Sequence, residues 1–224
     1  MKLIKPFYEI LTPINKEEIF KTIEKVARTC YKSEDKITET SAEEMIKSLI
    51  KRGHEAMLEF FDITVKFTCD RGVSHELVRH RIASFAQEST RYCNYSKDKF
   101  DNQVTFIIPE WTSFKEGTYT SALSIPFDKE EFKGEVNWFI HMIHSETIYN
   151  ELIKDGWQPQ QARAVLPNSL KTEINVKMNL REWRHFFKLR TAVVAHPQMR
   201  ELTRPLLDEM KIKLPILFDD ITYD

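Results

Sequence analysis

The feature that most constrains this chain is a dense polar segment, residues 79–91, which reads Arg-His-Arg-Ile-Ala-Ser-Phe-Ala-Gln-Glu-Ser-Thr-Arg. It holds three guanidiniums, an imidazole and a carboxamide, with few apolar neighbours to cover them. Arginine is always charged, and its planar fork of donors matches phosphate and carboxylate oxygens in pairs. Because so many cations repel one another unless an anion lies among them, the segment predicts either a solvated basic loop or an anion-binding loop.

Two observations favour the anion-binding loop. Within the segment, the cations alternate with Ser and Gln side chains, which can hydrogen-bond the edge of a uracil-like base. Downstream, Arg163 lies in an Ala-Arg-Ala-Val-Leu-Pro run, and a cation among apolar residues needs a partner because burying it unpaired is costly. The alternative is a non-catalytic nucleotide- or RNA-binding module that uses the same loop, with Tyr92 and Tyr95 as weak candidates for base stacking.

The spacing within the segment resembles the signature of the flavin-dependent thymidylate synthases: Arg-His-Arg, two residues, Ser, four residues, Ser, one residue, Arg. The resemblance implies methylation of dUMP to dTMP, with methylenetetrahydrofolate as carbon donor, FAD as hydride carrier and NADPH as reductant. Many members carry Asn-Glu where this chain has Ala86 and Gln87, so one flavin contact is expected to be lost. Gln87 can hydrogen-bond a nucleotide but cannot act as a base.

Two further stretches resemble the same family. Its members place Gly-His-Glu beside the flavin, as at residues 53–55 here, and usually carry a small hydroxyl residue where this chain has Ala56, which leaves only a backbone contact. They also place an arginine that contacts dUMP in the setting of Arg163. Arg190 matches the arginine that polarises the uracil ring, where a fixed cation beside the N3–C2 edge would stabilise developing negative charge. We therefore expect Arg190 to be the catalytic residue.

The resemblance divides the candidate site residues between two ligands. The residues expected to bind dUMP are Glu76, Arg79, Gln87, Glu88, Ser89, Arg91, Arg163 and Arg190. The residues expected to bind FAD are His54, Ala56, Arg79, His80, Arg81, Gln87, Asn179, Arg181 and His185, the last of which is more often Asn in the family. The family builds each site from several subunits, which implies a homotetramer with shared sites, and the aromatic residues Phe60, Phe61 and Trp138 suit such an interface.

Composition excludes several other classes of protein. The formal charge is −1, with 33 basic and 34 acidic residues, so there is no net electrostatic reason to expect nucleic-acid or membrane binding. With five glycines and no G-x-G-x-x-G motif, a flavin would not be held by a Rossmann turn. We find no basic-then-apolar leader and no apolar run near the ~20 residues that span a bilayer.

The cysteines indicate a cytoplasmic protein without a structural metal. Cys30, Cys69 and Cys93 are widely spaced and form no C-x-x-C motif, which suits a reducing compartment. Cys93 invites comparison with the nucleophile of the flavin-free thymidylate synthases, but its surroundings differ, and we expect a small buried thiol. His141 and His144 lack a carboxylate–histidine partner motif, so we expect no metal site and assign them to a helix surface or a subunit contact.

Apolar periodicity predicts strands and helices without strict alternation. Strands are expected over residues 4–11, 63–68, 104–108 and 174–179. Helix starts are expected where a capping residue precedes Glu by three positions: Asn15, Ser41, Asp128 and Asn179. A final helix is expected over residues 198–210. This order predicts one domain over residues 1–224 of α/β (α+β type) class, with a mixed, largely antiparallel sheet covered by long helices.

Two local expectations bear directly on the site. Gly53 should end the second helix in the C′ position, just before His54. Asp70 should cap a short helix that carries His75 and Arg79 on one face and Glu76 and His80 on another. The polar segment would then unroll from the end of this helix as a loop, followed by an extended stretch over residues 92–95.

Overall fold

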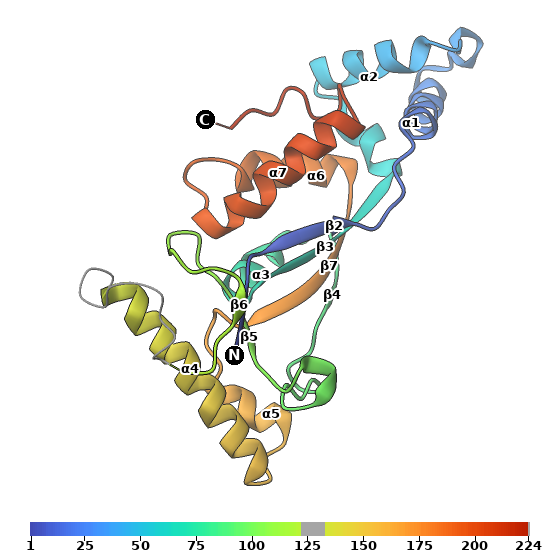
Figure 1. Cartoon of the computed structure of the whole chain (residues 1–224). Helices are drawn as coiled ribbons and strands as arrows, with labels where there is room; N and C mark the ends of the chain where they lie inside the picture. The colour runs from blue at the N-terminus through green and yellow to red at the C-terminus, as the bar shows by residue number, and fades with distance from the viewer. Residues whose placement is uncertain (122–132, 224) are drawn as a thin grey trace. The chain divides into compact units, whose positions relative to one another are not determined.

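The computed structural model describes residues 1–121 and 133–223 (Figure 1). Its contacts divide the chain into two compact units. The first unit comprises Met1–Phe7, Thr68–Leu77 and Ala86–Ile174. The second unit comprises Tyr8–Phe67, Val78–Phe85 and Asn175–Asp224. Since each unit combines segments that are distant in sequence, the chain passes between them several times, and a single domain over the whole chain stays a prediction.

The first unit is built around a small mixed sheet and one long helix. Strand β1 (Lys2–Ile4) pairs in parallel with β5 (Thr105–Ile107) and antiparallel with β6 (Gly117–Thr118). Helix α4 (Lys133–Lys154) contributes Phe139 to the same core cluster as Leu3 and Phe106. The other helices among the described residues of this unit are α3 (Arg71–Leu77), η3 (Asp98–Phe100), α5 (Pro159–Ala162) and η5 (Arg163–Val165).

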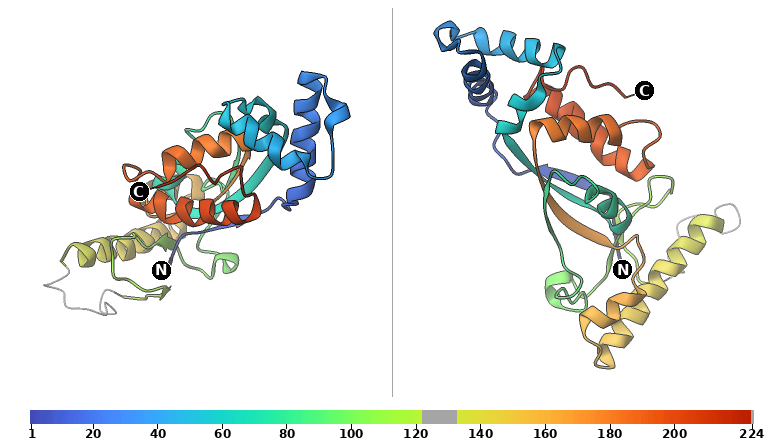
Figure 2. Two further views of the ribbon diagram at one scale, coloured as in Figure 1. Left: turned by 90° about the horizontal axis from the view of Figure 1, so that it is seen from above. Right: turned by 180° about the vertical axis from the view of Figure 1, so that it is seen from behind.

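The second unit is mainly helical. Helices α1 (Lys16–Tyr31) and α2 (Ser41–Lys51) pack together, as do α6 (Leu180–Arg190) and α7 (Pro197–Lys213) (Figure 2). The apolar face of α6 is fully buried because it carries Trp183, Phe186 and Phe187, whose rings contact one another. Two short 3₁₀ helices, η1 (Glu34–Lys36) and η2 (Glu55–Phe60), complete the unit.

Four strands form a second sheet, in the order β2 (Phe7–Ile10), β3 (Asp62–Asp70), β7 (Lys171–Asn179) and β4 (Ser84–Gln87). Alternate residues of β7 are buried, as the period of two in the sequence predicts. In β3 the alternation holds as far as Phe67, whereas Thr68, Cys69 and Asp70 are all buried. The mixed α/β class with long covering helices is thereby confirmed. Among the described residues, no helix combines the length and apolar character needed to cross a bilayer.

Local capping fixes the elements that carry the site, and most predicted caps are confirmed. The Asn15 and Asn179 side chains accept the backbone N–H groups of Glu18 and Glu182 at 3.3 and 2.9 Å. Asp70 accepts the N–H of Val73 at 2.6 Å, which starts α3. Gly53 has φ +68°, the left-handed conformation that favours glycine, and so ends α2 as predicted.

Other local predictions are wrong. Ser41 is not a helix cap, because its hydroxyl accepts the Thr38 N–H at 2.8 Å and the helix begins at Ser41 itself. Helix α3 ends at Leu77, so Arg79 and His80 lie beyond it and share no helical face with His75 or Glu76.

The predicted extended elements also differ from the structure. Residues 84–87 of the polar segment form strand β4 rather than loop, whereas residues 92–95 contain a turn instead of an extended stretch. The strand predicted over residues 4–11 is two strands, interrupted at Pro6, which has no N–H for a ladder. The predicted helix start at Asp128 lies outside the described residues.

Candidate functional site

The polar segment crosses from one unit to the other along β4. Residues 79–85 belong to the second unit, and residues 86–91 belong to the first. The candidate residues divide in nearly the same way. All those expected to bind dUMP lie in the first unit, except Arg79 and Arg190. All those expected to bind FAD lie in the second unit, except Gln87. Each unit therefore gathers the residues predicted for one ligand.

The first unit contains a cavity of about 380 Å³ beside Arg163. It is lined by Arg71, His75, Thr90, Arg163, Ala164, Leu166, Pro167, Asn168 and Leu170. The Arg163 guanidinium donates to the Thr90 hydroxyl at 2.9 Å, which links η5 to the polar segment. Arg163 is exposed, and Thr90 is the partner that the apolar surroundings of Arg163 in the sequence led us to expect.

Arg71 and His75, which were not predicted as site residues, add two basic side chains to the Arg163 cavity. Both lie on α3, four residues apart and therefore on one helix face. Three basic groups around one cavity suit an anionic ligand such as a phosphate. The i, i+4 spacing behind the Asp70 cap was the signal that could have identified them.

Gln87 is anchored within the first unit. Its side-chain nitrogen donates to the hydroxyls of Ser74 and Thr172, at 2.9 and 3.2 Å, and both of these residues are buried. Because both hydrogens of the amide are used in this way, Gln87 would contact a ligand through its carbonyl oxygen, which is an acceptor.

Glu88 is held by two donors. Its carboxylate accepts from the Tyr95 hydroxyl and from the Lys171 ammonium, both at 2.9 Å. Burial, followed by the charge of Glu88, raises the pKa of Tyr95, which keeps the phenol protonated as a donor. Burial acts to lower the pKa of Lys171, but hydrogen bonds to Glu173 and Glu88 outweigh it, so the net shift is upward and the lysine stays charged. The position of Glu88 is thus fixed before any ligand binds.

The end of the polar segment is a turn that presents Arg91 to solvent. The Ser89 hydroxyl accepts the Arg91 N–H at 3.3 Å, and the Ser89 carbonyl accepts the N–H groups of Tyr92 and Cys93. The Arg91 guanidinium lies over the Tyr92 ring, 5.5 Å from its centroid. Glu76 is half-buried on α3 in the same unit.

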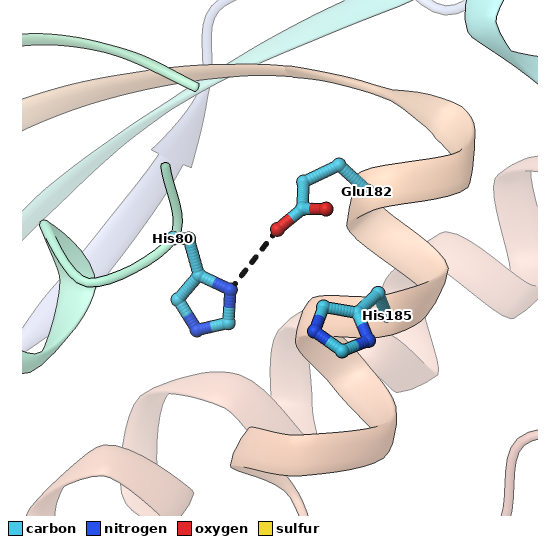
Figure 3. A group of neighbouring side chains, drawn as sticks. All are labelled: His80, Glu182 and His185. Atoms are coloured by element: carbon cyan, nitrogen blue, oxygen red, sulfur yellow. Dashed lines mark hydrogen bonds and ion pairs between the residues drawn. The ribbon is translucent and has the colours of Figure 1, made fainter. Parts of the chain in front are cut away.

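The second unit contains a buried histidine between two charged side chains of α6. His80 is 5 % exposed, and its Nδ1 lies 3.2 Å from Glu182 Oε1 (Figure 3). The Nε of Arg190 donates to His80 Nε2 at 3.0 Å. The Phe186 ring packs edge-on against the imidazole, with the centroids 4.9 Å apart. Burial lowers the pKa of His80, and the nearby Arg190 charge adds to this, while the hydrogen bond to Glu182 opposes it.

His80, Glu182 and His185 also lie close enough together to suggest a metal site. In this arrangement, both ring nitrogens of His80 already have protein partners, and one of those partners is a guanidinium. A cation bound here would lie beside the charge of Arg190. The chemistry of the group therefore favours hydrogen bonding over metal coordination.

A cavity of about 460 Å³ opens beside α6. It is lined by Glu55, Glu59, Ile82, Asn179, Arg181, Glu182, His185 and Lys188. Arg181, His185 and Lys188 are exposed, and they could together hold the phosphates of a dinucleotide. Arg181 pairs with Glu59 at 2.6 Å, so an anionic ligand would have to compete with this carboxylate.

The other residues predicted to bind FAD lie on the surface of the second unit. The Nδ1 of His54 is 3.0 Å from the Tyr31 hydroxyl. Ala56 is exposed on η2, and Arg79 and Arg81 are exposed on either side of His80. These side chains are accessible to a ligand, as flavin binding would require.

Comparison with solved structures shows which fold the chain has. A crystal structure described as a UMP/dUMP methylase PolB from Streptomyces cacaoi bound with 5-Br dUMP aligns with 98 % of this chain and 96 % of its own. The TM-score is 0.74 and the sequence identity 23 %, so the two chains share a fold. The same protein bound with 5-Br UMP aligns with a TM-score of 0.72 at 18 % identity.

Sequence comparisons identify the family. The family described as "Thymidylate synthase complementing protein" matches residues 14–216. A flavin-dependent thymidylate synthase of Pyrococcus furiosus is 36 % identical over 177 residues, which cover 79 % of this chain and 65 % of that protein. One from Geobacter sulfurreducens is 31 % identical over 201 residues, covering 87 % of this chain and 78 % of its own. The chain belongs to the flavin-dependent thymidylate synthase family, although the match spans only about two thirds of the Pyrococcus relative.

Proposed function

We propose that this protein methylates dUMP to dTMP, with FAD as hydride carrier, methylenetetrahydrofolate as carbon donor and NADPH as reductant. The observation that carries the proposal is the division of the candidate residues, with a cationic cavity on the nucleotide side and a second cavity with exposed cations on the flavin side. The spacing of the polar segment and the family membership support it. With three free cysteines, the protein suits a reducing compartment, and we place the reaction in the cytoplasm.

The nucleotide would bind in the first unit with its phosphate toward Arg163 and Arg91. Arg71 would add a second guanidinium to the same cavity, and His75 would add a ring nitrogen that can hydrogen-bond the ligand. Glu88, held by Lys171 and Tyr95, is positioned to accept a hydrogen bond from the sugar or base. Ser89, Gln87 and Glu76 are further members of the proposed set, and Gln87 would offer its carbonyl oxygen. The other two proposed contacts, Arg79 and Arg190, belong to the second unit.

FAD would be held by the exposed cations of the second unit. Arg181 and His185, with Lys188 beside them, suit its diphosphate. The other proposed contacts are His54, Ala56, Arg79, His80, Arg81, Gln87 and Asn179. When bound, FAD supplies the hydride chemistry, and the protein supplies position and charge.

Arg190 would act on the uracil ring. Its guanidinium is anchored through Nε to His80, which fixes the direction in which the other nitrogens point. A preorganised cation stabilises negative charge on the ring better than solvent does, because it needs no reorganisation during the reaction. This route needs no covalent thiol.

A substitution of Cys93 tests whether the reaction needs a covalent thiol. Burial, with the charge of Glu88, raises the pKa of the Cys93 thiol, so at neutral pH it is not a thiolate nucleophile. We therefore expect Cys93→Ser to form dTMP at a rate within about an order of magnitude of the wild-type rate, because only a small packed thiol is altered. The assay is dTMP formation at saturating FAD. A folded, flavin-loaded Cys93→Ser protein without activity would indicate covalent catalysis instead.

We further propose a homotetramer with shared sites. FAD is a large ligand, and the residues proposed to bind it come from several separate segments. Phe60 is 62 % exposed and suits an interface, whereas the Trp138 indole donates to Ser169 within its own unit and is half-buried. Neighbouring subunits can complete such a site through closed symmetry.

Complementation tests the shared sites. Two inactive variants, Arg91→Ala in the first unit and Arg190→Ala in the second, are mixed under conditions that allow subunit exchange. Activity should return in the mixture, because some sites would draw both intact segments from different chains. Proven exchange without recovery would mean that both segments come from one chain, and a monomeric mass by light scattering would contradict the tetramer.

A direct assay tests the activity itself. The purified protein should be yellow, or become yellow with added FAD, and should form dTMP only when dUMP, methylenetetrahydrofolate and NADPH are all present. Omission of each component in turn is the control. A protein that stays colourless with excess FAD and forms no dTMP, yet binds RNA, would establish the non-catalytic alternative.

A further inference from the structure

The second unit contains a continuous hydrogen-bonded chain from Glu182 through His80 to Arg190. Its two links are 3.2 Å and 3.0 Å long, and its middle member is almost fully buried. Glu182 and Arg190 belong to the same helix, α6, whereas His80 comes from the polar segment. These hydrogen bonds therefore connect the polar segment, through His80, to Arg190, the candidate catalytic residue.

The identity of the donors fixes the protonation state of His80. An arginine side chain has only donors, so Arg190 Nε–H can bond His80 Nε2 only when that nitrogen carries a lone pair. The proton of the neutral ring must then be on Nδ1, where it is donated to the Glu182 carboxylate. The lowered pKa of His80, caused first by burial, agrees with a neutral ring. Protonation at Nε2 would place two donors face to face and break the link to Arg190.

We propose that Glu182 and His80 are positioning residues, which hold Arg190 in the orientation needed to polarise the nucleotide ring. The inference rests on the proposed function. Glu182 selects the Nδ1–H tautomer, and the tautomer supplies an acceptor for Arg190. Packing of Phe186 against the imidazole fixes the ring, so the acceptor position is set by the buried core. Because His80 is held in this way, its bond to Arg190 keeps the Arg190 guanidinium from rotating away as the ligand enters.

The charges that face His80 all come from α6: Glu182, His185 and Arg190. Glu182 raises the pKa of the imidazole, while Arg190 and His185 lower it. Two variants should therefore shift this pKa in opposite directions. Glu182→Gln should lower the pKa of His80, and Arg190→Ala should raise it.

The first experiment is a histidine NMR titration, which does not depend on turnover. Protein labelled with ¹⁵N-histidine is titrated, and the His80 signals are assigned by their loss in His80→Phe. We expect the Nδ1–H tautomer in the wild-type protein and the two opposite pKa shifts in the variants. An Nε2–H tautomer, or a His80 pKa unchanged by Arg190→Ala, would overturn the proposal even if the protein forms no dTMP.

The second experiment measures turnover at saturating FAD, so that flavin affinity does not enter the rate. His80→Phe keeps the ring packing but has no acceptor, and should lower kcat on the order of 10²-fold with little change in KM for dUMP, since misplacing a catalytic group costs about this much. His80→Gln, which offers one donor and one acceptor, should recover part of the loss. In the wild-type protein the acid limb of kcat should follow His80, and Glu182→Gln should move it to lower pH.

The outcomes separate the two claims. If the wild-type protein forms no dTMP, the proposed function is contradicted. The NMR titration would then still show whether Glu182, His80 and Arg190 are hydrogen-bonded as described. Normal kcat in folded His80→Phe, with an active wild-type protein, would overturn the positioning role alone. Equal loss in His80→Phe and His80→Gln, with an acid limb that Glu182→Gln does not move, would reduce His80 to a packing residue.

Discussion

Arg190→Ala should yield a folded protein that binds FAD but has lost most of its dTMP formation. Arg190 is expected to act on the reacting ring, and removal of a preorganised charge from such a position costs on the order of 10²-fold or more in kcat. The residue ends α6, where the helix dipole favours a cation, and its Nε is bonded to buried His80. Arg190 itself is only half-buried, so truncation should remove the charge and the bond to His80 while the apolar face of α6 stays packed.

The measurement is kcat at saturating dUMP and FAD, with flavin absorbance and thermal unfolding as controls for binding and folding. Arg190→Lys is the matched variant, and it should also be poor. A lysine is a point charge and cannot both bond His80 and direct a planar fork at the ring. Near-normal turnover in Arg190→Ala would remove Arg190 from the mechanism and return attention to Arg79.

Local signals in the sequence were sufficient for much of the fold. The Asn15 and Asn179 caps, the Asp70 cap and the Gly53 helix end were all predicted, because each depends on side chains within a few residues of one another. The prediction that Ser41 caps a helix was wrong, although Ser41 has the same local pattern. Its hydroxyl bonds the preceding Thr38 backbone, and the sequence pattern does not distinguish this from a helix cap.

Parts of the candidate site depend on contacts between distant residues, which a single sequence does not reveal. His80 lies 102 residues from Glu182 and 110 from Arg190, so the hydrogen bonds that join these three residues could not be predicted. Strand β4 was missed because it is short and carries polar residues, and none of its four residues is fully buried. The sequence indicated that Arg163 needs a partner but not which one, because Thr90 lies 73 residues away.

Several of the predicted site residues line cavities or contact the polar segment. Arg163 reaches Thr90 of the polar segment, and Arg181 and His185 line one cavity. The resemblance did not include the residues that hold the candidate side chains in place, such as Lys171 and Tyr95, which donate hydrogen bonds to Glu88. These contacts are buried hydrogen bonds and ion pairs between residues distant in sequence, so they can be identified only from the structure.

Arg184→Met should destabilise the second unit more than any surface substitution on α6. The Arg184 side chain is 1 % exposed, and it pairs with Glu55 at 3.0 Å and with Asp220 at 2.7 Å. It also donates to the Leu217 carbonyl. The Glu55 and Asp220 side chains are 20 % and 44 % exposed, so water can partly solvate both carboxylates once Arg184 is removed. The loss of these pairs and of the bond to the buried Leu217 carbonyl should therefore cost about 1–3 kcal/mol of unfolding free energy.

Arg181→Met on the same helix is the matched control. Arg181 also pairs with a glutamate of η2, Glu59, but its side chain is 53 % exposed. Exposed pairs contribute about 0.2–1 kcal/mol, so this variant should unfold close to the wild-type protein in urea at neutral pH. Equal unfolding free energies for the two variants would mean that burial of Arg184 adds nothing to its pairing.

The cost of Arg184→Met should also depend on pH, with a sign set by Asp220. The hydrogen bond from Arg184 lowers the pKa of Asp220, although burial opposes this. A lowered carboxyl pKa gives stability that is present above the ordinary aspartate pKa of about 3.9 and lost as the pH falls through the folded value. The difference between wild-type protein and Arg184→Met should therefore be largest near neutral pH and shrink below about pH 4. Urea unfolding at a series of pH values checks this, and a difference that stayed constant down to the acid range would show that Asp220 does not contribute to the pairing.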